Sequence, residues 1–313
     1  MLHMHLPQAL PHAAVNQLPF PLVEPEPPKT FTTQFLTSLK HSNATQNVYF
    51  ANYFEWQGQA RELWFVECIA ADFLADAGVF VTSNAHNNFF REAFPFETVE
   101  CRVNVFNIKK CSFSIHFNFL IDGEISAEGY QNIAFTSHDK KIKALPREIL
   151  DKIRQYEAPC HVDETPLKLP ASALAPLRHT RNKRYFTEFR TTLKHSNATQ
   201  NVYFSNYFDW QGAAREQWFF DRIDPTMLQN EGVFVTAIAD NQFIKEALPF
   251  QVVRCEVYSF SIQRCAFHLG FDFYIGEELI SKGYQKIVFA NHEKRIARLP
   301  ADVLAKVAEY ERV

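Results

Sequence analysis

One long segment of this chain occurs twice. Residues 40–65, KHSNATQNVYFANYFEWQGQARELWF, recur as residues 194–219, KHSNATQNVYFSNYFDWQGAAREQWF, with a shift of 154 positions and four substitutions. The same shift relates residues 31–157 to residues 185–311 without a gap. Solenoid repeats are about 20–50 residues long, so two units of this length indicate one domain present twice.

The repeat sets the domain boundaries that we expect. Residues 1–30 contain seven prolines and no apolar run long enough to span a membrane, which predicts an extended, partly disordered lead-in. The first domain then covers residues 31–157, a linker covers 158–184, and the second domain covers 185–313.

Each domain has the same expected order of elements. A short strand over residues 31–39 (185–193 in the second copy) leads into a polar loop at 43–47. A helix then runs from Val48 to about Cys68, with Asn47 as its N-cap. Four strands follow at about 78–84, 97–108, 111–121 and 124–137, and Pro146 opens a short terminal helix.

The long helix dictates the architecture. Its sequence is apolar on nearly every side, which is typical of a helix that is buried all round. A curved antiparallel sheet wrapped around it is the economical cover. We therefore predict an α+β fold, a double hot-dog, in which the sheets of the two units join edge to edge because an open edge invites association.

The composition of the chain limits the kinds of partner and cofactor that we expect. The chain has a net charge of −3 and no basic run, which argues against a nucleic-acid partner. Six cysteines form no CxxC pair, so we expect free thiols in a reducing, cytoplasmic compartment, with no metal and no cofactor. Aromatic residues make up 15% of the chain and include 31 Phe, which suits either a Phe-rich core or an apolar channel.

The helix carries an arginine that needs an explanation. Tyr53, Gln57 and Arg61 are spaced four residues apart and share one helical face. A charged side chain in so apolar a helix is costly unless it is paired or functional. Arg61 therefore either pairs with Glu62 or Glu55, or holds the oxygen of a bound carbonyl or phosphate; the same choice applies to Arg215.

The motif Ser-Asn-x-x-x-Asn-Val-Tyr-Phe-x-Asn-Tyr-x-x-Trp-Gln-Gly-x-x-Arg-Glu, with Gly-Tyr-Gln at residues 129–131, resembles the hot-dog thioesterases of enediyne polyketide biosynthesis, within the hydroxybenzoyl-CoA-thioesterase-like group. The resemblance implies one set of catalytic residues per copy: Asn43, Tyr53 and Arg61, and Asn197, Tyr207 and Arg215. Hot-dog active sites lie between paired units, so we expect each site to take its helix end from one copy and part of its wall from the other. The chain departs from that family in fusing two units, in having Thr45-Gln46 in a loop where the family tends to have a glycine, and in having His41 at a place that is often acidic.

The resemblance also implies a reaction. Broader relatives have an aspartate where this chain has Asn43, so catalysis would rest on positioning and electrostatics. Asn43 would orient a water or the carbonyl, and Arg61 would bind the acyl oxygen. We expect the substrate-binding and oxyanion groups at Asn47, Val48 and Tyr49, and at Asn201, Val202 and Tyr203. The possible bases are Glu62, Glu216, His41 and His195.

The implied substrate is an acyl thioester, of a polyketide or polyunsaturated β-ketoacyl chain, on an acyl carrier protein or coenzyme A. We expect a homodimer of double hot-dogs and no membrane partner. A hot-dog dehydratase or hydratase and a non-catalytic acyl-binding protein are the alternatives. The dehydratase needs a histidine and a carboxylate facing each other, and the central helix has no histidine in either copy.

Overall fold

The computed structural model describes residues 27–71, 78–160, 183–226, 232–291 and 293–312. Most of the predicted lead-in and linker lies outside these ranges. The first unit contains β1 (Phe31–Leu36), η1 (Leu39–His41), α1 (Asn52–Trp64), η2 (Phe65–Ile69), β2 (Val79–Phe89), β3 (Thr98–Phe106), β4 (Ser112–Ile121), β5 (Glu124–Thr136) and α2 (Arg147–Arg154). The second contains β6 (Tyr185–Arg190), η3 (Leu193–His195), α4 (Asn206–Trp218), η4 (Phe219–Ile223), β7 (Gly232–Phe243), β8 (Val252–Phe260), β9 (Ala266–Ile275), β10 (Glu278–Asn291) and α5 (Ala301–Ala308).

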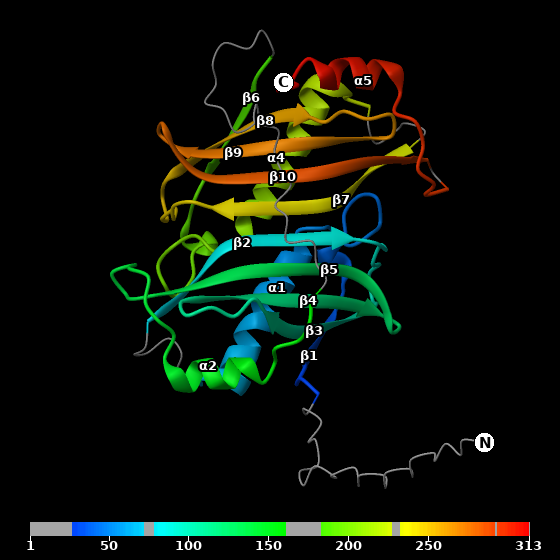
Figure 1. The fold of residues 1–313 in the computed structure, drawn as a ribbon. Coiled ribbons are helices and arrows are strands. Elements are labelled where there is room, and N and C mark those ends of the chain that lie inside the picture. Colours follow the sequence, from blue (N-terminus) through cyan, green and yellow to red (C-terminus); the bar gives the residue numbers. More distant parts are fainter. Residues whose placement is uncertain (1–26, 72–77, 161–182, 227–231, 292, 313) are drawn as a thin grey trace, which may run out of the picture.

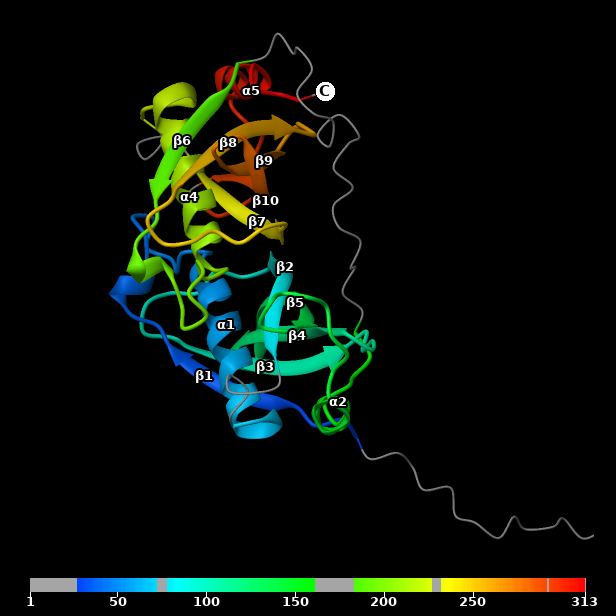
Figure 2. The ribbon, with the colours of Figure 1, turned by 90° about the vertical axis from the view of Figure 1, so that its left-hand side faces the viewer.

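The strands form one continuous sheet. Its ten strands run in the order β1-β3-β4-β5-β2-β7-β10-β9-β8-β6, and all named neighbours are antiparallel. Helices α1 and α4 lie on the same face of the sheet, each over the strands of its own unit, and α2 and α5 lie at the two ends of the molecule (Figures 1 and 2). This is the predicted double hot-dog, joined edge to edge through β2 and β7.

The junction between the units is centred on one residue pair. In the β2–β7 register His86 lies opposite Asp240, and these two residues are related by the 154-residue shift. A residue on the pseudo-twofold axis would face its own copy in an identical pair. Here His86 Nδ1 lies 3.1 Å from Asp240 Oδ2, both side chains are buried, and Asn84 Nδ2 donates to the same carboxylate at 3.1 Å.

Strand β2 is longer than the sequence predicts. The expected strand over residues 78–84 continues to Phe89, and the added residues pair with β7. The sequence pattern did not predict this part of the strand, because the polar residues Asn84, His86, Asn87 and Asn88 show no alternation of apolar and polar positions. Much of this polarity is buried at the junction, where His86 and Asn87 are less than a tenth exposed.

The central helix also differs from its prediction. It begins at Asn52 rather than Val48, and Ala51 rather than Asn47 occupies the N-cap position. Its buried face includes Tyr53, Trp56, Ala60 and Trp64, but Glu55, Gln59 and Leu63 form an exposed stripe, so the helix is not covered on every side. The two helices meet at Phe54 and Phe208, whose nearly parallel rings have centroids 3.3 Å apart.

Two smaller findings concern cysteines and membranes. All six cysteines are free, with Cys101 and Cys255 buried in equivalent strands, as the sequence predicts. Among the described residues, none of the helices is both long enough and apolar enough to cross a bilayer.

The junction predicts an effect on stability. His86→Asp places a second carboxylate opposite Asp240 in a buried site, and we expect it to lower the free energy of unfolding by about 3–5 kcal/mol. The exchange variant H86D/D240H should recover most of that loss. Urea denaturation measures both, with Ser83→Ala as the control, since alanine stands at the equivalent position 237. If H86D were as stable as the wild type, the pair would not matter for joining the units.

Candidate active site

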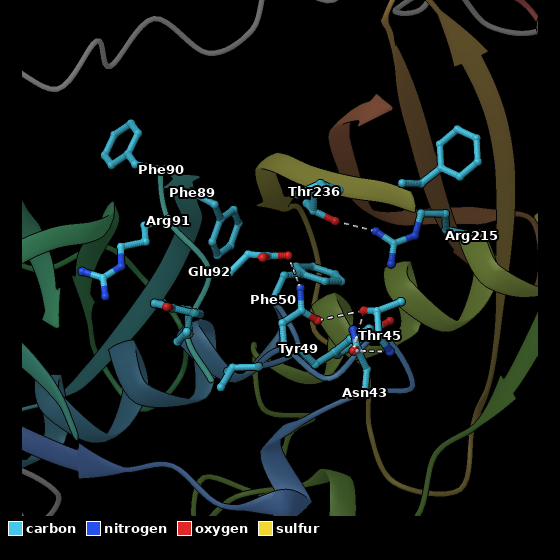
Figure 3. A pocket seen from close by; sticks show the side chains of 16 residues that line it. Asn43, Thr45, Tyr49, Phe50, Phe89, Phe90, Arg91, Glu92, Arg215 and Thr236 are labelled. Carbon is cyan, nitrogen blue, oxygen red and sulfur yellow. Dashed lines mark hydrogen bonds between the residues drawn. The ribbon is translucent and has the colours of Figure 1, made fainter. Parts of the chain in front are cut away.

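Two equivalent pockets lie where the units meet. The first, of about 140 Å³, is lined by the 43–50 loop and the end of β2 from the first unit, and by Arg215 and Phe234–Thr236 from the second (Figure 3). The second, of about 170 Å³, is lined by Asn197–Phe204 and the end of β7 together with Arg61 and Val79–Ser83. Each pocket therefore combines the loop of one unit with the arginine of the other.

This arrangement regroups the predicted residues. The sequence groups Asn43, Tyr53 and Arg61 by copy, but the first pocket contains Asn43, Tyr53 and Arg215. The second pocket contains Asn197, Tyr207 and Arg61. The reason is that α1 spans both pockets: Tyr53 lies near its start in one, and Arg61 lies two turns later in the other.

The Asn43 loop is a tight polar turn. Asn43 Oδ1 accepts the Thr45 amide N–H at 3.0 Å and lies 2.7 Å from Thr45 Oγ1, and the Gln46 amide N–H donates to the Asn43 carbonyl. Gln46 has a left-handed φ of 67°, a conformation that favours glycine. The side-chain oxygen of Asn43 is thus used within the loop, which leaves its amide group to face a ligand.

The guanidinium of Arg215 is held by the second unit. Its Nη1 donates to Thr236 Oγ1 at 2.6 Å and to Gln285 Oε1 at 2.8 Å. Gln285 in turn donates to Gln211 on α4, so the contacts extend into the buried helix–sheet interface. The guanidinium also lies 5.2 Å from the Phe50 ring centroid of the other unit. Arg61 has the equivalent partners in the other pocket, namely Thr82, Gln131 and the Phe204 ring.

Both explanations offered for the arginines have a structural counterpart. Arg61 Nη2 lies 3.3 Å from Glu62 Oε1, and Arg215 Nη2 lies 3.1 Å from Glu216 Oε1. The arginine side chains are only 11% and 12% exposed, yet they line the pockets. A guanidinium has five N–H donors, so an ion pair does not use up its capacity for a ligand.

Tyr53 lines the first pocket, and its hydroxyl is buried. Its ring packs edge-on against Trp56, Phe89 and Phe119. Burial raises the pKa of Tyr53 to about 12, and the neighbouring Ser126 opposes that rise. The Ser126 hydroxyl donates a hydrogen bond to the Phe119 carbonyl, and within the described chain Tyr53 Oη has no hydrogen bond of good geometry. The hydroxyl therefore stays protonated near neutral pH.

The mid-helix glycines make room for tyrosines of the opposite unit. A Cβ on Gly212 would lie 2.0 Å from Tyr49 Oη, and one on Gly58 would lie 2.1 Å from Tyr203 Oη. Through these gaps Tyr49 donates to Glu216 Oε1 and Tyr203 donates to Glu62 Oε1, each at 2.6 Å. Glu62 and Glu216, considered as bases from the sequence, are therefore partners of a tyrosine and an arginine.

Several predicted roles need correction. The Val48 and Tyr49 amides do not face the pocket as free donors, because they donate to the Ala93 and His41 carbonyls at 2.7 and 2.8 Å. Val202 and Tyr203 have the same backbone bonds, to Ala247 and His195. The reason is that the helix begins later than predicted, and residues 48–51 form a turn tied to the loop.

His41 and His195, which the sequence offered as possible bases, lie in short turns outside the two pockets. The Nδ1 of His41 accepts the Ser38 amide N–H at 2.9 Å, and His195 does the same with Thr192, so each closes a short 3₁₀ turn. Neither histidine is among the described residues that line the two pockets.

One carboxylate in the first pocket was missed from the sequence. Glu92, in the connection from β2 to β3, points into the pocket, and Asn47 Nδ2 donates to its Oε1 at 2.6 Å (Figure 3). Its copy, Glu246, lines the second pocket. The connection has no periodicity that would single it out. The sequence signal that could have identified this glutamate is its repetition: Glu92 and Glu246 are identical in the two copies, whereas the two residues before each of them differ.

A wider groove continues from the second pocket. It encloses about 620 Å³ and adds the apolar Phe65, Val66 and Gly78 to residues shared with the pocket. Its lining also includes the polar residues Arg61, Tyr203, His138 and Lys140. The groove is large enough for an extended apolar chain beside the arginine.

The glycine contacts predict a sensitive position. Gly58→Ala forces Tyr203 away and breaks its bond to Glu62, and we expect a loss of about 1–3 kcal/mol of stability from overpacking. Alanine's higher helix propensity offsets up to about 1 kcal/mol of that. Thermal denaturation measures the difference, with Gln59→Ala as the neighbouring control because the second copy has alanine there. A G58A chain more stable than wild type would contradict the packing described.

Comparison with known proteins agrees with this fold. Residues 40–153 match the Thioesterase-like superfamily. No curated protein sequence matches the chain. Among solved structures, the chain is similar to a Lactobacillus plantarum protein with a proposed oleoyl thioesterase activity, with a TM-score of 0.69 and 12% identity over 84% of this chain and 97% of that one.

Two further structures are similar over most of their length. The 12:0-ACP thioesterase of Umbellularia californica has a TM-score of 0.67 and 11% identity, over 83% of this chain and 94% of that one. An acyl-ACP thioesterase of Bacteroides thetaiotaomicron has a TM-score of 0.62 and 14% identity, over 83% and 97%. At such identities the likeness establishes the double hot-dog fold of this chain.

Proposed function

We propose that this protein is a thioesterase that hydrolyses an acyl thioester carried on phosphopantetheine, either on an acyl carrier protein or on coenzyme A. The observation that carries the proposal is the pocket that brings Asn43 and Tyr53 from one unit against Arg215 from the other. The match of residues 40–153 to the Thioesterase-like superfamily supports the reaction class. The three similar structures are described as thioesterases, which supports it further.

The pocket suits a thioester carbonyl. Hydrolysis places negative charge on the carbonyl oxygen, and preorganised donors in a partly buried site stabilise that charge. Arg215 is fixed by Thr236 and Gln285 and keeps N–H groups for the oxygen. The Asn43 amide is a further donor at the pocket, and Tyr53, whose hydroxyl is buried, forms part of the pocket wall.

The acyl chain would occupy the apolar groove. Phe65, Val66 and Phe80 line it, and it opens from the pocket that contains Arg61. The motif shared with the enediyne polyketide thioesterases favours a polyketide or polyunsaturated β-ketoacyl chain as the substrate. No cofactor or metal is required for this mechanism.

The chain also has features that suit pairing with a second copy. Phe96 and Phe250 occupy equivalent turns, have left-handed φ values of 74° and 69°, and are 70% and 67% exposed. Bulky side chains rarely adopt this backbone conformation, and its strain is typical of functional surfaces. We expect a homodimer that buries these turns, and light scattering after size exclusion measures it. A monomer at micromolar concentration would contradict this expectation.

The cross-unit pockets make a specific prediction for double variants. Asn43→Ala with Arg215→Ala damages one pocket only, so about half of the activity should remain if the two pockets act independently. Asn43→Ala with Arg61→Ala damages both pockets, and the rate should fall by about a hundredfold or more. Release of free thiol from acyl-CoA and acyl-carrier-protein thioesters measures the rate.

The control is Arg102→Ala, because Arg102 is half exposed on β3 and lies outside both pockets. If N43A/R61A kept half of the activity and N43A/R215A lost nearly all, the pockets would be formed within each unit and the assignment would be wrong. Tight binding of acyl thioesters without release of thiol would instead identify an acyl-binding protein.

A further inference from the structure

The first pocket contains a carboxylate beside the groups that would bind the thioester. Of the described residues that line it, Glu92 is the sole acidic one, and no histidine joins it. In the second pocket Glu246 is likewise the sole acidic residue among the described residues of the lining, again without a histidine. The glutamate is thus retained at the two places where the loop asparagine, the tyrosine and the cross-unit arginine meet.

We propose that Glu92, and Glu246 in the second pocket, is the general base that activates the attacking water. This inference rests on the proposed thioesterase function and adds a residue to it. Water is a poor nucleophile, and a positioned base contributes about 10²–10⁴-fold to such a reaction. Glu62 and Glu216 are less suited because neither is among the described residues that line the two pockets, and Glu62 lines the adjoining groove instead.

Glu92 is held in place from both units. Asn47 Nδ2 donates to Oε1 at 2.6 Å, and Lys294 of the second unit forms an ion pair with Oε2. Lys294 is itself placed over the Phe94 ring, 4.6 Å from its centroid. Glu246 forms the equivalent ion pair with Lys140 of the first unit. Each carboxylate oxygen has a second lone pair, so these contacts orient the group and leave it able to accept a proton.

The position of Lys294 links the base to the assembly of the two units. Lys140 and Lys294 lie in equivalent turns after β5 and β10, with left-handed φ values of 63° and 61°. Each turn projects its lysine across the unit boundary to the glutamate of the opposite loop. The base, like the arginine, therefore reaches its working position only when the units are paired.

The reaction step balances without a further reactant. A water held by Glu92 attacks the thioester carbonyl carbon, and its proton passes to the carboxylate as the new C–O bond forms. The π electrons of the carbonyl move to its oxygen, beside Arg215. When the tetrahedral intermediate collapses, the C–S bond breaks and the carboxylic acid of Glu92 returns the proton to the leaving thiolate. The products are a free acid and a thiol.

The test uses the full chain with both pockets altered. Glu92→Gln with Glu246→Gln keeps the side-chain shape and an oxygen acceptor for Asn47 but cannot take a proton. We expect kcat to fall by about a hundredfold or more while KM changes little. Glu277→Gln, in an exposed turn, is the matched control and should have the wild-type kcat.

A second pair of variants separates chemistry from structure. Glu92→Ala with Glu246→Ala leaves room for a small carboxylate, and added formate should restore part of kcat there but none in the glutamine variant. A merely structural role would show no formate rescue. Wild-type kcat in the glutamine variant, or an alanine variant that formate does not restore, would overturn the assignment of Glu92.

The wild-type chain separates this proposal from the one it rests on. If the wild type releases no thiol from any acyl thioester tested, the thioesterase function fails and the role of Glu92 fails with it. If the wild type is active and the E92Q/E246Q chain is equally active, only the role of Glu92 fails.

Discussion

The arrangement of both pockets depends on the antiparallel pairing of β2 with β7. This pairing sets the two units about an axis through His86 and Asp240, and so places the loop of each unit beside the arginine of the other. The contact is polar, and the Asp240 carboxylate is approached by both Asn84 Nδ2 and His86 Nδ1. A slip by one residue would turn these side chains to the opposite face, so the buried polar groups fix the register.

A second set of contacts reinforces this pairing on the helix side. Phe54 and Phe208 stack at the axis, and Tyr49 and Tyr203 each cross to the opposite helix through the space left by a glycine. The tyrosine hydroxyls reach the glutamates that flank the arginines. The residues that hold the units together are thus immediate neighbours of those that would bind the substrate, and any change in the unit interface would move the pocket walls.

The sequence was informative where the chemistry is local and repeated. The repeat and the apolar helix sufficed to predict the double hot-dog, and the motif located Asn43, Tyr53 and Arg61, although their catalytic roles remain predictions. The sequence could not show that Asn43 shares a pocket with Arg215, because spacing along one copy does not reveal which arginine lies opposite its loop. It also misplaced the start of the helix, since Val48 and Tyr49 are as apolar as the helical residues that follow.

Fusing the two units in one chain permits what an identical pair does not. In an identical pair a residue on the axis faces itself, so a buried histidine would meet a histidine and a buried aspartate an aspartate. Here the two positions differ, and the unlike pair is complementary. The same freedom extends to the pocket walls, where Phe90 and Ile244 are equivalent but unlike, while the asparagine, tyrosine, arginine and glutamate are kept in both. Equivalent residues of the two copies are identical where the proposed chemistry requires it. They differ where they affect only the fit to an acyl chain or to the other unit.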